Sequence, residues 1–270
     1  MNKKRVNFNQ PENHTINITP YWLVGFVEAE GYFSVSSINH KLIFGIGQSA
    51  SDLNVLVAIK EFLLGLPGKY RITRADTNPI NISVDRKAKN QNSKPMAKIE
   101  IAKTDFITNI LVPFFDNYTW YSKKVLDYKD WKVMLIIKND GKHFTSEGNE
   151  IFTLISKRIN RNRLSTNSEN NAINIESIIS KLLASPSNYE IQPDGKILIK
   201  SSGNSLKGRG NIGVNVFDSN EILINGFSSI KECALYYDVS ERTINRRLDK
   251  GSLVEHDGKN IVFKREVTLP

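Results

Sequence analysis

The sequence predicts an α+β protein in which helices cover one face of an antiparallel sheet. The main observation is the order of its periodic segments up to about residue 165: helix, two strands, helix, two or more strands, then helices. Composition agrees, because 40% of the 270 residues are hydrophobic and 24% are charged, as in ordinary globular proteins. Mean hydropathy is -0.34, and no stretch approaches the roughly 18 consecutive apolar residues of a membrane span. We therefore expect a folded protein with no membrane partner.

The first expected helix has Thr19 as its N-cap and Pro20 at its first helical position, and Gly31 stops it after Glu30. The later elements are expected to be, in chain order, strands at 32–38 and 41–49, a helix capped by Asp52 that runs to Leu64, strands at 69–75 and 96–103, a helical stretch opened by Asp105, and helices at 122–138 and 147–164. The polar segment between the last two strands leaves room for a short strand at 80–85.

The simplest interpretation of the sequence is a protein of two domains. After an N-terminal tail at 1–18, the first domain is expected at 19–165. Residues 166–211 begin and end in polar, Ser-rich stretches without periodicity, so they are expected to be a linker. Residues 212–270 form a compact unit of two strands and two helices, with Gly251 as the final helix stop.

The charge balance indicates the kind of partner. The chain has 37 Lys and Arg residues against 28 Asp and Glu residues, a net charge of +9, and a pI near 9.4. Nucleic acid or an anionic membrane surface would suit this charge, and solvated charged faces are the ordinary alternative. The single cysteine, Cys233, excludes an internal disulfide and a zinc site built from cysteines. Heavy use of Asn, Ile and Lys, whose codons are A/T-rich, favours an organellar genome.

The first helix combines small residues with a carboxylate at its end. Gly25 and Ala29 are four residues apart, so they share one helix face and allow a second helix to approach closely. Glu30 lies in the last turn, where the helix dipole disfavours a negative charge. A carboxylate beside free carbonyl oxygens suits a hard divalent cation, and two packed helices would bring two copies of Glu30 together. The ordinary alternative is a buried amphipathic helix with Glu28 and Glu30 exposed.

Residues 23–31, which read LVGFVEAEG, resemble the LAGLIDADG motif of the homing endonuclease family, with Glu30 where the name motif has Asp. One copy is present, and residues 100–270 contain no second copy. Further family-like features are the Phe-x-Ile-x-Gln pattern of Phe44, Ile46 and Gln48, the Ser122-Lys123-Lys124 helix start that leads to Tyr128 and Trp131, and the HFTSEG stretch at 143–148. The resemblance covers residues 19–165.

The resemblance implies a helix–β–β–helix–β–β–helix domain whose antiparallel sheet binds DNA. It also implies that Glu30 and the Ala29 carbonyl bind Mg²⁺, that Gln48 orients the attacking water, and that Lys123 or Lys124 offsets transition-state charge. For Gln48 and the lysines, a surface amide and solvated charges are the alternatives. One motif gives half an active site, so a homodimer is expected, with Gly25 and Ala29 at its interface.

The sheet is expected to contact DNA. Residues 69–103 carry nine Lys and Arg against three Asp and Glu, and basic and apolar residues alternate from Lys69 onward. A β-ribbon can enter the major groove, where Lys and Arg read guanine. A solvated sheet face is the alternative. The DNA-binding candidates are Ser34, Ser36, Lys69, Arg71, Arg74, Lys98 and Glu100.

Residues 227–251 have a helix, a short turn and a basic helix, the helix-turn-helix pattern. Structural helices are the alternative, but the segment 214–251 resembles the nuclease-associated modular DNA-binding domain. Its last helix supplies the DNA-binding candidates Arg242, Thr243, Asn245, Arg246 and Arg247.

These features predict a site-specific, Mg²⁺-dependent double-strand DNA endonuclease, encoded in a group I intron of a fungal mitochondrion and made there without a targeting segment. One alternative is an RNA maturase that assists splicing of its own intron, with that intron RNA as partner. A second alternative is a DNA-binding protein that no longer cleaves.

Overall fold

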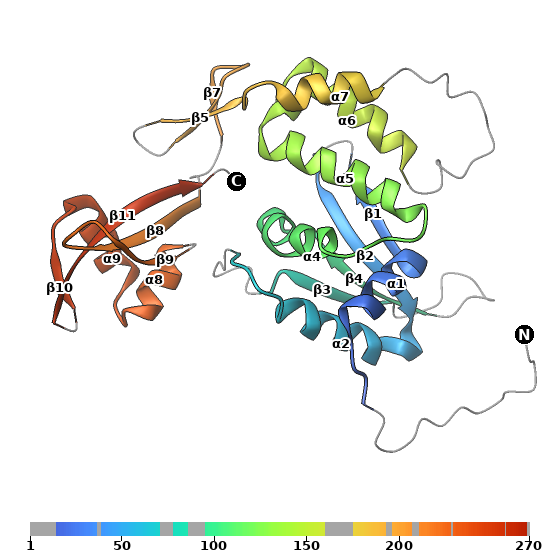
Figure 1. Cartoon of the computed structure of the whole chain (residues 1–270), viewed down its shortest axis with the longest axis horizontal. Helices are drawn as coiled ribbons and strands as arrows, with labels where there is room; N and C mark the ends of the chain where they lie inside the picture. The colour runs from blue at the N-terminus through green and yellow to red at the C-terminus, as the bar shows by residue number, and fades with distance from the viewer. Residues whose placement is uncertain are drawn as a thin grey trace, which may run out of the picture.

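The computed structural model describes the protein in the segments 15–36, 39–70, 78–85, 95–159, 175–192, 196–206, 211–227, 229–256 and 258–268. Within them, the first part of the chain folds as an antiparallel sheet, in the strand order β1-β2-β4-β3, with helices packed on one face (Figure 1). The α+β prediction is therefore confirmed.

Helix α1 (Pro20–Glu30) begins as predicted, since the Thr19 side chain accepts a hydrogen bond from the Trp22 N–H at 3.3 Å. It also ends at Gly31, but for a different reason. Gly31 is extended, with φ of -73°, so no left-handed cap is formed. A Cβ atom there would lie 2.6 Å from the Val27 carbonyl oxygen, and only glycine fits this close turn from helix to strand.

Three of the four strands in the sheet lie where they were expected, and the fourth is formed by a different segment. Strands β1 (Gly31–Val35) and β2 (Leu42–Ser49) pair as a hairpin, β2 pairs with β4 (Met96–Ile101), and β4 pairs with β3 (Ile80–Val84). The expected strand at 69–75 is not the fourth one: Lys69 and Tyr70 are outside any strand, and 71–77 lie outside the described residues. The short run at 80–84 takes that place, because its Ile80 and Ile82 alternate toward the core.

The covering helices follow the predicted order with altered ends. They are α2 (Leu53–Leu64), α3 (Thr104–Phe106), α4 (Val112–Asp116), α5 (Lys124–Asn139) and α6 (Ser146–Arg158), with a π-helical turn at Ile107–Leu111 between α3 and α4. Asp52 occupies the N-cap position of α2, as predicted, but it also closes a 3₁₀ turn and its side chain makes no capping hydrogen bond. Helix α6 ends before the expected residue 164, since Ile159 is already extended.

One core joins the sheet to these helices. The register pairs Phe33 with Phe44 and Phe44 with Ile101, so their side chains form a row on the inner face. The rings of Trp131 on α5 and Phe115 on α4 lie 5.3 and 6.3 Å from that of Phe33. All five side chains are fully buried. This face is therefore committed to the core, and the opposite face of the sheet stays available.

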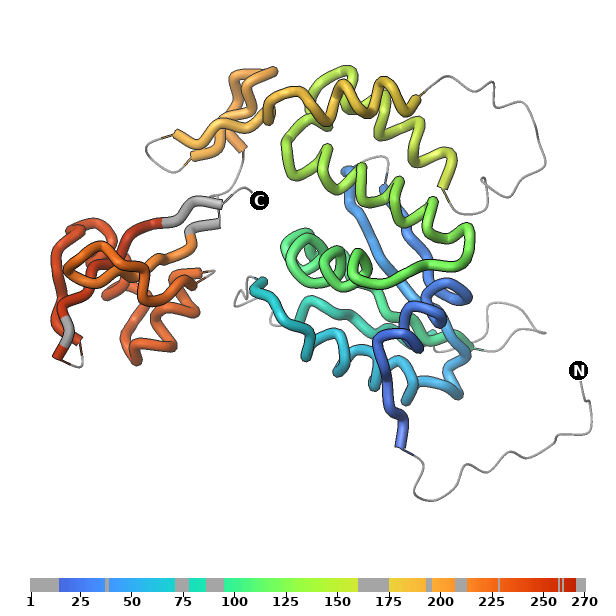
Figure 2. The backbone as a smooth tube through the Cα atoms, in the orientation of Figure 1, coloured from blue at the N-terminus to red at the C-terminus, as the bar shows by residue number. Residues whose placement is uncertain are grey.

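The region expected to be a linker is partly folded. Helix α7 (Ile175–Ala184) runs alongside α6 (Figure 2), and it buries Ile179 and Leu182 in the main core. A small sheet of β5 (Tyr189–Ile191), β6 (Ile197–Ile199) and β7 (Asn204–Ser205) follows. The sequence reading missed these elements because each is short and flanked by polar residues.

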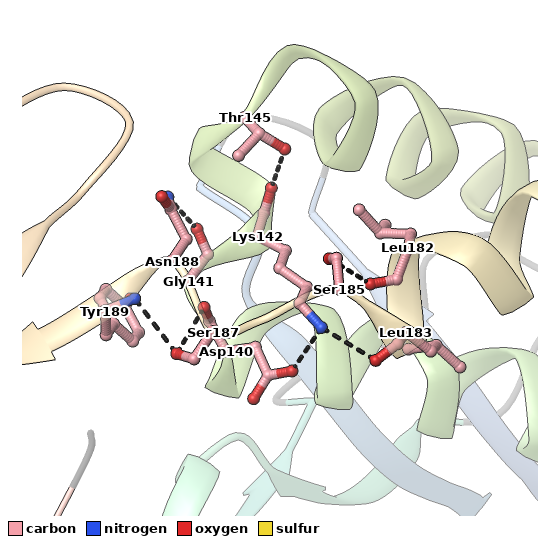
Figure 3. Close-up of polar contacts among 10 residues, drawn as sticks. All are labelled: Asp140, Gly141, Lys142, Thr145, Leu182, Leu183, Ser185, Ser187, Asn188 and Tyr189. Carbon is pink, nitrogen blue, oxygen red and sulfur yellow. Dashed lines mark hydrogen bonds and ion pairs between the residues drawn. The ribbon is translucent and has the colours of Figure 1, made fainter.

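A buried polar junction attaches this segment to the first part of the chain (Figure 3). The Lys142 ammonium, 2% exposed, lies 2.8 Å from the Asp140 carboxylate and donates to the Leu183 carbonyl at 3.1 Å. Buried Asn188 donates from its side-chain amide to the Gly141 carbonyl at 2.9 Å, and from its backbone N–H to the Asp140 carbonyl at 2.8 Å. Segment 175–192 is thus docked on the loop that follows α5.

The C-terminal unit has its own core. Its elements are β8 (Asn211–Asp218), β9 (Leu223–Phe227), α8 (Ile230–Tyr236), α9 (Glu241–Lys250), β10 (Val254–His256) and β11 (Lys259–Thr268), with the sheet order β10-β11-β8-β9. Gly251 ends α9 in the left-handed region, as predicted. The last two strands were not predicted; β11 supplies Ile261 and Phe263 to this core, and Val254 of β10 packs against it.

Candidate active site and nucleic-acid interface

The end of α1 presents Glu30 to solvent. Ala29 and Glu30 are both exposed, while the neighbouring Val27 is fully buried. The Gly31 N–H binds the Val27 carbonyl, and the later carbonyls of the last turn lie beyond the helix's own hydrogen bonds. A carboxylate next to such carbonyl oxygens is a donor set that suits a hard divalent cation.

Lys124 reaches the same place from the start of α5. Its Nζ donates to the Gly31 carbonyl oxygen at 2.7 Å, directly after Glu30 in the chain. Lys123, the other candidate, precedes the helix and is exposed. An ammonium has three donors, so Lys124 keeps two beyond its bond to Gly31. The geometry favours Lys124 over Lys123 as the lysine beside Glu30.

Strand register places Gln48 near the start of β1. Gly31, the first residue of β1, is paired with Ile46, so Gln48 lies two residues past the partner of Gly31 on β2. It is half-buried and continues the side of β2 that carries Phe44 and Ile46. The structure therefore places Lys124 beside the residue that follows Glu30, and it places Gln48 on the strand that pairs with the start of β1.

Glu28 makes a contact that the sequence did not predict. Its Oε1 accepts hydrogen bonds from the backbone N–H groups of Tyr121 and Ser122, each at 2.6 Å. The expected alternative role for Glu28 was a solvated charge. No sequence signal pointed to these bonds, because 93 and 94 residues separate the partners.

The outer face of α1 is apolar and open. Tyr21 is 77% exposed, Trp22 stacks on Phe26 with ring centroids 4.7 Å apart, and a Cβ atom at Gly25 would meet nothing within 4 Å. Its other face already holds Leu23, Val24 and Val27 in the core. A helix that is apolar on both faces is suited to burial on both.

The outer face of the sheet carries polar candidates in a compact arrangement. Tyr32, Ser34, Lys98 and Glu100 point away from the core by alternation and are half-buried. The Tyr32 hydroxyl donates to Glu100 at 3.0 Å, and burial, with the Glu100 carboxylate second, raises the pKa of Tyr32 to about 12. The Tyr32 ring covers Gly45, where a Cβ would lie 2.2 Å from it.

The remaining sheet candidates are placed unevenly. Ser36 follows β1, and its N–H binds the Lys41 carbonyl at 2.9 Å in the hairpin. Exposed Lys69 donates to the Gly226 carbonyl in the C-terminal unit at 2.5 Å, so it holds a protein contact instead of lying on the sheet. Arg71 and Arg74 lie outside the described residues.

The α9 candidates separate into two groups. Arg242 and Arg246 are exposed on the helix surface. The Thr243 hydroxyl is hydrogen-bonded to the hydroxyl of Ser240, the N-cap of α9, at 2.9 Å. The Asn245 side chain donates to the Glu241 carbonyl at 3.0 Å. Arg247 does not project outward as expected, because its guanidinium lies over the Phe263 ring at 5.1 Å.

Two further findings concern ligands. The described residues contain no group of three or more His, Cys, Asp or Glu side chains that could hold a metal ion. Within that part of the chain, Glu30 therefore does not belong to such a group. No helix in the described part of the chain has the length and apolarity that a bilayer crossing requires.

Comparison with known proteins gives consistent similarities. Residues 23–135 match the family model for the LAGLIDADG endonuclease. The chain is 28% identical over 247 residues to the uncharacterized mitochondrial protein RF1 of Saccharomyces cerevisiae, covering 86% of this chain and 50% of that protein. It is 32% identical over 146 residues to the probable intron-encoded endonuclease 3 of Neurospora crassa, covering 52% and 24% respectively. The chain thus spans half or less of these relatives.

Among solved structures, the I-LtrWI LAGLIDADG homing endonuclease bound to target DNA is similar at 24% identity with a TM-score of 0.44, covering 57% of this chain and 48% of that one.

Proposed function

Residues 23–135 of this chain belong to the LAGLIDADG endonuclease family, and from this premise we propose that the protein is an intron-encoded, site-specific double-strand DNA homing endonuclease. The observation that carries the proposal is the hydrogen bond from Lys124 to the Gly31 carbonyl, directly after exposed Glu30 at the end of α1, with Gln48 two residues past the partner of Gly31 on β2. A carboxylate, an amide and an ammonium are the groups that phosphodiester hydrolysis needs for metal binding, water orientation and charge compensation.

The Glu30 carboxylate and the Ala29 carbonyl would hold Mg²⁺, since both are oxygen ligands from exposed residues at a helix end. When bound, the ion would activate water and stabilise charge at the scissile phosphate. Gln48 would orient that water through its side-chain amide, and the free donors of Lys124 would offset charge on the phosphate oxygens.

A homodimer would complete the site. Helix α1 leaves an exposed apolar face with open space at Gly25, which suits the α1 helix of a second copy. Pairing of the two helices would place two copies of Glu30 near each other, which would add a second carboxylate where the described residues of one chain hold no group of three such side chains.

DNA would lie on the outer face of the sheet, against Ser34, Ser36, Lys98 and Glu100, with Arg71 and Arg74 retained as candidates. The C-terminal unit would grip flanking DNA through Arg242 and Arg246, the exposed basic residues of α9. We place the gene in a group I intron of a fungal mitochondrion; the names of two fungal relatives, one mitochondrial and one intron-encoded, support the organelle and the intron.

The test is a cleavage-site selection on a randomised double-stranded DNA library, in Mg²⁺ and in EDTA. We expect one enriched site, cut on both strands in Mg²⁺ alone. Uncut DNA under both conditions would overturn the nuclease proposal. Tight binding of the intron RNA in a parallel titration, without any cleavage of DNA, would identify a maturase instead.

A further inference from the structure

Glu28 is bound to a segment distant in sequence. A single carboxylate oxygen, Oε1, receives two consecutive backbone N–H groups, those of Tyr121 and Ser122, at 2.6 Å each. Adjacent N–H groups that converge in this way form a small anion-binding concavity. Hydrogen bonds to a charged acceptor are also shorter and stronger than neutral ones. The contact is therefore a firm attachment between α1 and the segment that precedes α5.

Glu28 and Glu30 point in different directions because an α-helix turns 100° per residue, so side chains two apart lie about 200° apart around the axis. Glu30 is exposed, whereas Glu28 is half-buried against the loop. The two carboxylates of the motif therefore serve separate surfaces, and Glu28 is not placed as a second metal ligand beside Glu30.

The bound segment leads directly into the lysine of the site. The Lys124 N–H donates to the Ser122 Oγ at 3.2 Å, and the Lys124 Nζ donates to the Gly31 carbonyl. The segment is thus attached to α1 at Glu28 and again at Gly31, three residues further along.

Side-chain packing does not fix Tyr121 and Ser122 themselves. Tyr121 is 89% exposed and Ser122 is exposed. The nearest anchor upstream is Trp120, which stacks on Tyr128 and donates to the Phe115 carbonyl. Between that anchor and Lys124, the Glu28 carboxylate holds the backbone.

From this geometry we propose that Glu28 is a positioning residue, which holds the start of α5 so that Lys124 reaches the end of α1. This inference rests on the proposed nuclease function. It assigns to Glu28 no contact with substrate or metal, and it predicts that the effect of Glu28 on catalysis passes through Lys124.

A double-mutant cycle tests that route. The variants are Glu28→Ala, Lys124→Met and the pair of them, compared by single-turnover cleavage rates on bound DNA. We expect Glu28→Ala to lose about a hundredfold in rate, the size that misplacement of a catalytic group can cost. The double variant should be within about twofold of Lys124→Met, because two residues that act as a unit are not additive. A double variant whose rate loss equals the product of the two single losses would overturn the proposal.

Two matched variants complete the test. Glu28→Gln keeps an oxygen acceptor at the same position and should lose less than Glu28→Ala. Glu61→Ala removes an exposed carboxylate from α2 and should cleave as the original protein does. Equal losses of cleavage rate in Glu28→Gln and Glu28→Ala would contradict a role based on accepting the two backbone hydrogen bonds.

Amide hydrogen exchange separates this inference from the nuclease proposal. In Glu28→Ala, the N–H groups of Tyr121 and Ser122 should exchange at least about tenfold faster, while amides in β2 should keep their protection. Unchanged exchange at both positions would overturn the positioning role, whether or not the protein cleaves DNA. Faster exchange in a protein that cuts no DNA would retain the structural contact and reject the nuclease function alone.

Discussion

The Nζ atom of Lys124 donates a hydrogen bond to the carbonyl oxygen of Gly31 at 2.7 Å, across 93 residues of sequence. Gly31 is extended and follows the last residue of α1, so its carbonyl lies at the end of the motif helix. The bond places a positive charge there and distinguishes Lys124 from the adjacent, exposed Lys123. Lys124→Met and Lys123→Met therefore form a natural pair of variants for the cleavage assay.

The first prediction concerns Glu30. Glu30→Gln should lower the cleavage rate at least about a hundredfold, because it removes the charged metal ligand and about 3 kcal/mol of transition-state stabilisation. DNA binding should be retained, since the side chain keeps its shape. Rates measured on a selected site in Mg²⁺ check this, and a rate near that of the original protein would reject Glu30 as a metal ligand.

The second prediction concerns the open face of α1. Gly25→Leu should prevent close helix pairing at a cost of about 1–3 kcal/mol or more, while the fold of one chain is kept, because the space at Gly25 is open. Sedimentation should show monomers of the variant at concentrations where the original protein is a dimer on its DNA. A monomeric original protein on its cognate site would contradict the dimer.

The third prediction concerns the buried junction. Asp140→Ala should lower the free energy of unfolding by about 3 kcal/mol, because it leaves the Lys142 ammonium buried without its carboxylate partner. The matched variant Glu176→Ala removes a 71% exposed partner of Arg158 and should cost less than about 1 kcal/mol. Urea unfolding of both checks the contrast, and equal effects would show that burial does not govern the Lys142 pair.

The fourth prediction concerns stability in acid. Burial, and then the charges of His40 and Lys138, lower the pKa of His143 from 6.5 to about 4, while the Ile137 carbonyl opposes the shift. The unfolded chain therefore takes up this proton first, so the contribution of neutral His143 is complete above pH 6.5 and is lost as the pH falls toward 4.

His143→Gln should flatten the dependence of the free energy of unfolding on pH across this window. Urea titrations at several pH values between 4 and 6.5 measure the slope. An unchanged slope would assign the acid sensitivity to other groups.

The fifth prediction concerns α9. If Arg242 and Arg246 each contact a phosphate, replacing either by Ala should reduce the slope of log K against log salt by about 0.9. Arg247→Ala should instead destabilise the C-terminal unit, since Arg247 packs on Phe263. A slope that does not change in either surface variant would place the phosphate contacts elsewhere.

Local sequence determined much of the fold. Thr19 and Pro20 specified the start of α1, alternation specified β1, β2 and β4, and Gly251 specified the end of α9. In each case the cause lies within a few residues: a cap, a period of two, or a left-handed position. The motif also identified Glu30, which is exposed at the end of α1.

Tertiary structure decided what depends on distant partners. The fourth strand is 80–84 because its register with β4 directs Ile80 and Ile82 to the core, which no local count of basic residues reveals. Asn188 and Lys142 turned an expected linker into a docked segment.

The site shows the same division. The residue types came from the motif, but the choice of Lys124 and the attachment of Glu28 depend on bonds across more than 90 residues. A hydrogen bond needs its two atoms within about 3 Å, and only the folded chain brings such separated atoms that close.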